Sequence, residues 1–139
     1  MAEHLLRHLA AKRGLDLETA SAGIAAEPHY RVPEPAKRQL AAAGVPPFEH
    51  KTRLATRDVL RWADLILVMS EEHHDYIADL YPEFASRTRL FREAAGFGKQ
   101  DVEDPMAQSD EVFARCFSVI RESLDALLRA DFKSPAALP

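Results

Sequence analysis

The run Asp-Leu-Ile-Leu-Val-Met at residues 64–69 constrains the fold more than any other segment of this chain. A short, continuous apolar run is typical of a central parallel strand that is covered on both faces. Ser70 follows it as an N-cap for a helix predicted over residues 71–80, which Pro82 ends. A buried strand that leads directly into a helix indicates an α/β layered domain with a parallel sheet.

The rest of the pattern repeats this alternation. Further strands are predicted at residues 15–21 and 88–91, and further helices at residues 2–12, 35–43, 56–62 and 110–128. We therefore expect one three-layer α/β domain over residues 1–139, with a small parallel sheet and a loose tail at residues 131–139. Trp62 and Phe84 are expected to pack in the core or to cover it.

The chain starts directly on a helix, which is unusual for this class. Such folds usually open with a strand, and the loop after that strand presents backbone N–H groups at a helix N-terminus. We therefore expect the first strand of the sheet to be missing.

Charge and cysteine content exclude several classes of protein. The net charge is −4, so the chain lacks the basic surface of a nucleic-acid-binding protein. No stretch is long and apolar enough to span a bilayer. The single cysteine, Cys116, cannot form an internal disulfide. We expect a cytoplasmic protein with no nucleic-acid or membrane partner.

Five short motifs occur in order along the chain: Met1-Ala2-Glu3, Ser21-Ala22-Gly23, His50-x-x-Arg53, the apolar run ending at Met69, and Asp104-Pro105. Each is common by chance, but together and at these spacings they resemble the low molecular weight protein-tyrosine phosphatase family. That family includes the bacterial protein-arginine phosphatases. In the family, Met-Ala-Glu often follows a signature loop of Cys, five residues and Arg-Ser-Pro.

The resemblance implies a metal-free and cofactor-free chemistry. A cysteine thiolate attacks phosphorus, backbone N–H groups and an arginine hold the phosphoryl oxygens, and an aspartic acid protonates the leaving atom. It implies that Asp104 is this general acid, and that His50 and Ser21 brace the phosphate loop through hydrogen bonds. From the residues alone, Asp104 reads as a turn aspartate, since Asp-Pro commonly initiates turns, and the acid role comes from the resemblance. The alternative for His50 is an exposed loop histidine.

The nucleophile of that chemistry is absent from these 139 residues. Cys116 precedes Arg121 by four intervening residues rather than five, inside a predicted helix whose N–H groups are already bonded. We read Cys116 as a small buried apolar residue and expect the chain as given to be inactive. The interpretation we favour is a start codon mis-assigned at an internal methionine, with the first strand and signature loop encoded upstream.

Two other functions are carried by the same fold. A non-catalytic pseudophosphatase that acts as a binding or regulatory module stays open as the alternative. An arsenate reductase of the same fold relays electrons through further cysteines, which this chain lacks.

The resemblance also bears on partners. The expected substrate is a phosphorylated protein or a small phosphate ester. Met106-Ala107-Gln108 stand where tyrosine phosphatases usually carry aromatic residues, which leaves phosphotyrosine and phosphoarginine both open. A missing strand would leave residues 15–21 and 64–69 without their shared partner. We therefore expect a marginal monomer that is able to dimerise through the unpaired sheet.

Two histidine pairs offer potential metal ligands. His4 and His8 are four residues apart on a predicted helix, with Glu3 as the nearest carboxylate. His73 and His74 are adjacent, so they point in different directions from their helix. We expect all four to be solvated surface residues, and no metal site.

Overall fold

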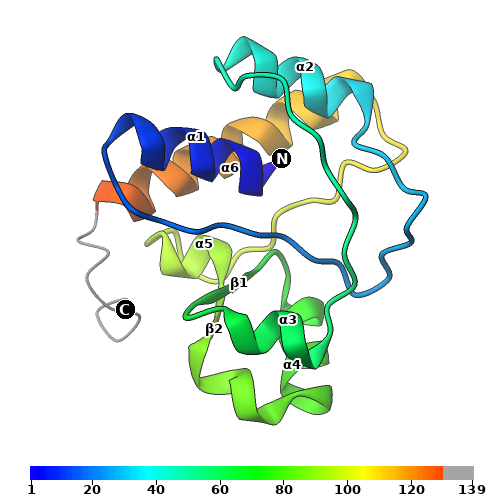
Figure 1. Ribbon diagram of the computed structural model, residues 1–139, viewed down its shortest axis with the longest axis vertical. Helices are drawn as coiled ribbons and strands as arrows, with labels where there is room; N and C mark the ends of the chain where they lie inside the picture. The colour runs from blue at the N-terminus through cyan, green and yellow to red at the C-terminus, as the bar shows by residue number, and fades with distance from the viewer. Residues whose placement is uncertain (130–139) are drawn as a thin grey trace.

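The computed structural model describes residues 1–129 and contains a small parallel sheet between helices (Figure 1). Strands β1 (Ile66–Val68) and β2 (Thr88–Leu90) pair in parallel, with Leu67 opposite Arg89. β1 lies inside the predicted strand at residues 64–69. The strand predicted at residues 88–91 is one residue shorter in the structure, because Phe91 begins helix α5 (Phe91–Ala94).

The helices predicted from apolar spacing and capping residues are confirmed to within a residue or two. They are α1 (Ala2–Lys12), α2 (Glu34–Ala42), α3 (Arg57–Trp62), α4 (Glu71–Leu80) and α6 (Asp110–Arg129). A 3-10 helix at Pro82–Arg87 was not predicted. The hydroxyls of Thr56 and Ser70 accept the N–H groups of Val59 and His73, as expected of N-caps.

Alternate residues of β1 face opposite helical layers. Ile66 and Val68 pack on one side with Leu60 of α3 and Ile77 of α4. On the other side, Leu67 packs against the larger cluster, which α1, α2, α5 and α6 supply. Helices α1 and α2 contact α6, while α4 contacts both strands. Both faces of the sheet are therefore covered, which is why the sequence of β1 is continuously apolar.

The predicted strand at residues 15–21 is wrong. In the described part of the chain, residues 16–22 form no backbone–backbone hydrogen bond, and the nearest pairing is an isolated parallel bridge between Gly23 and Leu54. A strand requires a neighbour that completes its hydrogen-bond ladder. No strand among residues 1–129 lies beside this segment, so its sequence preference is not realised.

Two predicted core aromatic residues behave differently. Phe84 is buried as expected, whereas Trp62 is 52% exposed and so is not a core residue. Trp62 ends the short helix α3, and its ring lies at the surface.

No helix within residues 1–129 is long and apolar enough to cross a membrane. The tail predicted at residues 131–139 lies outside the described residues.

Candidate functional site

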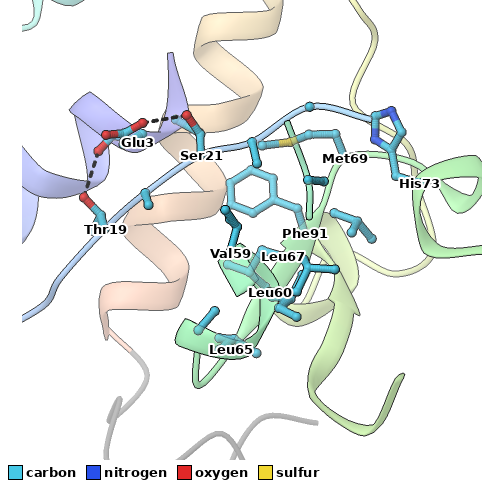
Figure 2. A pocket seen from close by; sticks show the side chains of 18 of the residues that line it. Glu3, Thr19, Ser21, Val59, Leu60, Leu65, Leu67, Met69, His73 and Phe91 are labelled. Atoms are coloured by element: carbon cyan, nitrogen blue, oxygen red, sulfur yellow. Dashed lines mark hydrogen bonds between the residues drawn. The ribbon is translucent and has the colours of Figure 1, made fainter. Parts of the chain in front are cut away.

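A cavity of about 310 Å³ separates residues 18–24 from β1 (Figure 2). Residues 65–69 form one wall, residues 18–24 form the other, and Phe91 and Leu124 contribute apolar side chains. Figure 2 shows Glu3 and Ser21 on one side of this cavity and His73 on the opposite side. The cavity extends from the first turn of α1 to the carboxyl end of β1.

The first turn of α1 is tied to residues 19–21 through Glu3. The Ser21 hydroxyl donates to Glu3 Oε2 at 2.5 Å, and Arg7 donates to Glu3 Oε1 at 2.7 Å and to the Thr19 carbonyl at 2.9 Å. Burial alone would raise the pKa of Glu3. The hydrogen bonds from Ser21 and Arg7, with the charges of His4 and Arg7, outweigh it and lower that pKa. Glu3 is therefore a carboxylate at neutral pH.

His50 joins the same cluster. Its Nδ1 lies 3.0 Å from His4 Nε2 and 3.8 Å from Glu3 Oε2. The His4 ring also stacks on Phe48, with 3.8 Å between ring centroids. His50 and Ser21, the two residues predicted to brace a phosphate loop, thus both approach Glu3 Oε2. Sequence reasoning missed Glu3 and His4 as members of this cluster, although Glu3 belongs to one of the motifs.

The prediction that His4 and His8 are solvated surface residues is wrong. His4 is 5% exposed, because the loop carrying Phe48 and His50 covers it. Burial lowers the pKa of His4, and the neighbouring Glu3 carboxylate partly opposes this. His8 is half-buried, with no hydrogen-bond partner for its Nε2 in residues 1–129. His73 and His74 are half-buried as well.

Glu3, His4 and His50 also present potential metal ligands. One donor atom from each lies within 4.8 Å of the others, and imidazole and carboxylate donors suit zinc. However, the two imidazoles are hydrogen-bonded to each other, and both Glu3 oxygens accept bonds from Ser21 and Arg7. The cluster is therefore already satisfied by protein partners.

Asp104 lies in an exposed loop that leads into α6. Its Oδ1 accepts the N–H of Met106 at 3.0 Å, the turn interaction that Asp-Pro sequences favour. Two residues earlier, the Val102 N–H donates to the Met69 carbonyl at 2.8 Å. The loop is thereby held at the carboxyl end of β1. Within residues 1–129, Asp104 forms no hydrogen bond or ion pair with Glu3, Ser21 or His50.

Cys116 is confirmed as a buried residue of α6, at 2% exposure. Its thiol donates to the Glu103 carbonyl at 3.2 Å. Burial raises the pKa of Cys116, and the nearby Glu103 carboxylate raises it further. The thiol is therefore protonated at neutral pH and is a poor nucleophile.

Comparison with known proteins places the chain in a family. The sequence matches the family described as low molecular weight phosphotyrosine protein phosphatase over residues 1–136. The protein-arginine-phosphatase of Bacillus subtilis (strain 168) is 27% identical over 129 residues, which cover 93% of this chain and 83% of that protein.

Two solved structures superimpose closely. A YwlE arginine phosphatase mutant with a phosphorylated active-site serine gives a TM-score of 0.87 at 25% identity, covering 95% of this chain and 88% of that one. The low molecular weight protein tyrosine phosphatase of T. tengcongensis gives a TM-score of 0.86 at 27% identity, covering 92% and 87%. With the family match over nearly all its residues, the chain belongs to the low molecular weight phosphotyrosine protein phosphatase family.

Proposed function

We propose that these residues supply the acid loop and the supporting network of a phosphoprotein phosphatase. Its thiolate nucleophile and phosphate-binding arginine belong to a Cys-x5-Arg segment that the 139 residues do not contain. The observation that carries the proposal is the hydrogen bond from Val102 to the Met69 carbonyl, which holds the Asp104 loop at the carboxyl end of β1. Ligands of open α/β sheets bind outside the carboxyl ends of the strands.

The first turn of α1 and the carboxyl end of β1 line the same cavity, through Ala2 and Glu3 of α1 and Met69 after β1. A helix N-terminus favours anions, because its first N–H groups are unpaired and the helix dipole is positive there. A phosphoryl group between α1 and the Asp104 loop would thus meet both an anion-binding helix end and a proton donor.

The chemical roles follow from this placement. A thiolate from the Cys-x5-Arg segment forms a bond to phosphorus, while Asp104 gives its proton to the leaving oxygen or nitrogen. Water then displaces the thiolate from phosphorus, and the Asp104 carboxylate takes up a proton from that water. Ser21 and His50 act as positioning residues, because their contacts with Glu3 and His4 fix the first turn of α1.

The proposed substrate is a phosphorylated protein. The similar protein of B. subtilis is a protein-arginine-phosphatase, and the phosphorylated active-site serine of the YwlE mutant is the counterpart of a covalent phosphoenzyme. Met106, which is exposed, follows Asp104-Pro105 without an aromatic ring. The lack of an aromatic side chain at residues 106–108 favours phosphoarginine over phosphotyrosine.

The test compares the 139-residue chain with a polypeptide in which an apolar strand and a Cys-x5-Arg segment precede Met1. We expect no hydrolysis of p-nitrophenyl phosphate or of phosphopeptides by the first, and turnover by the second. In the longer polypeptide, Asp104→Asn is expected to lower kcat about 10²- to 10⁴-fold. Asp16→Asn, at an exposed position outside the site, is the matched control.

Three results would count against the proposal. Turnover by the 139-residue chain would contradict the missing nucleophile. An inert but folded longer polypeptide would contradict the phosphatase function. Equal kcat values for Asp104→Asn and the Asp16→Asn control would remove Asp104 from the acid role.

A non-catalytic binding module is the second candidate, and the cavity beside β1 favours it. This function predicts that the 139-residue chain folds and binds a partner there without turnover.

A further inference from the structure

We propose that Asp101 is a positioning residue for the acid loop, defined here as residues 101–105. Its carboxylate ties this loop to the first residue of helix α4 and so holds Asp104 in place. The inference rests on the proposed function, in which Asp104 protonates the leaving atom. It adds a residue that lies outside the five sequence motifs.

Two adjacent hydrogen bonds attach the acid loop to the residues that follow β1. Asp101 Oδ1 accepts the backbone N–H of Glu71 at 2.9 Å. The next residue, Val102, has a buried side chain and donates its N–H to the Met69 carbonyl at 2.8 Å. One hydrogen bond would leave the loop free to turn about that contact, whereas two fix both its position and its direction. Asp104 follows two residues later, so its placement depends on that direction.

The bond to Asp101 satisfies a backbone group that helix α4 cannot satisfy by itself. Glu71 is the first residue of α4, and the first N–H groups of a helix have no acceptor within it. The Ser70 hydroxyl accepts the N–H of His73 instead. A carboxylate is favoured at this end of a helix, because the helix dipole is positive there. Hydrogen bonds to an ionised acceptor are also about twice as strong as neutral ones.

The attachment of the acid loop to α6 is weaker. Arg115 donates to Glu103 Oε2 at 2.8 Å, and the Cys116 thiol donates to the Glu103 carbonyl at 3.2 Å. Water screens the ion pair, because both of its side chains are about half exposed, and a thiol is a weak donor. Asp101 is exposed as well, but its donor is a backbone N–H that the helix holds fixed, so the bond orders a single side chain. The attachment to α4 therefore decides where the acid lies.

The test is kinetic and uses the longer polypeptide in which a Cys-x5-Arg segment precedes Met1. It compares phenyl phosphate with p-nitrophenyl phosphate, because phenolate is the poorer leaving group and depends more on a proton donor. Asp101→Ala is expected to lower kcat/KM for phenyl phosphate about 10- to 100-fold, as a misplaced catalytic group does, and about tenfold less for p-nitrophenyl phosphate. A loss of stability alone would lower both values equally.

Two further substitutions serve as controls for Asp101→Ala. Asp101→Asn keeps an acceptor oxygen, and asparagine accepts helix N–H groups about as well as aspartate, so this variant should stay close to the unsubstituted protein. Asp79→Ala removes an exposed aspartate near the other end of α4 and should leave both kcat/KM values unchanged. Circular dichroism melting shows whether each variant is folded.

Removal of the donor tests the hydrogen bond itself. Glu71→Pro deletes the N–H that Asp101 accepts, and proline is favoured at the first position of a helix. Glu71→Ala removes the same side chain but keeps the N–H, so it is the matched control. Because Glu71→Pro and Asp101→Ala break one and the same bond, Glu71→Pro should have no further effect in the Asp101→Ala background. In the 139-residue protein, Asp101→Ala should speed hydrogen exchange of the Glu71 and Val102 amides and leave α6 protected.

The outcomes separate this inference from the proposed function. An inert but folded unsubstituted polypeptide overturns the proposed function, and the inference with it. If that polypeptide is active, three results overturn the inference alone. They are equal losses by Asp101→Ala with both substrates, an Asp101→Ala variant that behaves like Asp79→Ala, and a further loss from Glu71→Pro in the Asp101→Ala background. Unchanged hydrogen exchange of the Glu71 amide in Asp101→Ala would overturn it as well.

Discussion

Removal of the Ser123 hydroxyl is expected to destabilise the fold more than removal of the charge of Glu122, although Glu122 is the carboxylate opposite Arg92. Arg92 Nη1 donates to Glu122 Oε2 at 2.8 Å and to Ser123 Oγ at 2.9 Å. Its guanidinium also lies over the Phe97 ring, 4.0 Å from the centroid. Arg92 itself is 9% exposed, so its N–H groups have little access to water.

Burial decides the order of the two effects. Ser123 is 0% exposed, so Ser123→Ala leaves a buried charged donor without its acceptor, at a cost of about 1–3 kcal/mol. The Glu122 side chain is 54% exposed, and ion pairs screened by water contribute about 0–1 kcal/mol. Glu122→Gln also keeps an oxygen acceptor for Arg92, so its cost falls at the lower end.

Urea denaturation of the two variants measures the difference. With an m-value of about 2 kcal/mol/M, Ser123→Ala is expected to lower the midpoint by about 1 M, and Glu122→Gln by about 0.3 M or less. Ser86→Ala, at an exposed serine, serves as the control and should leave the midpoint unchanged. A Glu122→Gln variant that loses as much stability as Ser123→Ala would refute the argument from burial.

Three further predictions concern the site and the core. Burial lowers the pKa of His4 from its ordinary 6.5, so the unfolded chain binds more protons and stability falls as the pH drops below 6.5. The slope is at most about 1.4 kcal/mol per pH unit. His4→Phe should remove this pH dependence, which urea titrations at pH 7.5 and 5.5 measure. A wild-type protein that is more stable at pH 5.5 than at pH 7.5 would contradict the prediction. Leu124→Ala, at 1% exposure in the core, should cost about 2–5 kcal/mol of unfolding free energy; less than 1 kcal/mol would mean that the core closes around the gap. Ser70→Ala removes the N-cap of α4 and should cost about 1 kcal/mol by the same assay, with an unchanged midpoint as the contrary result.

Features that depend on neighbours in sequence were predictable. The hydroxyls of Thr56 and Ser70 cap helices because an N-cap acts on backbone groups two or three residues away. The continuous apolar run around β1 indicated a strand covered on both faces, which the packing confirms. The mid-helix position of Cys116 indicated a buried thiol, and five ordered motifs indicated the family that the comparisons confirm.

Features that depend on distant neighbours were decided only by the tertiary structure. A strand is predicted at residues 15–21, but a strand exists only where another backbone completes its ladder. His4 looked like a surface residue on its helix, yet the loop at Phe48 and His50 folds over it and lowers its pKa. The meeting of Ser21 and His50 around Glu3 likewise joins three separate segments. The sequence by itself determined the local elements and the family, because both are encoded in short windows. The site cluster arises from packing between segments far apart in the chain.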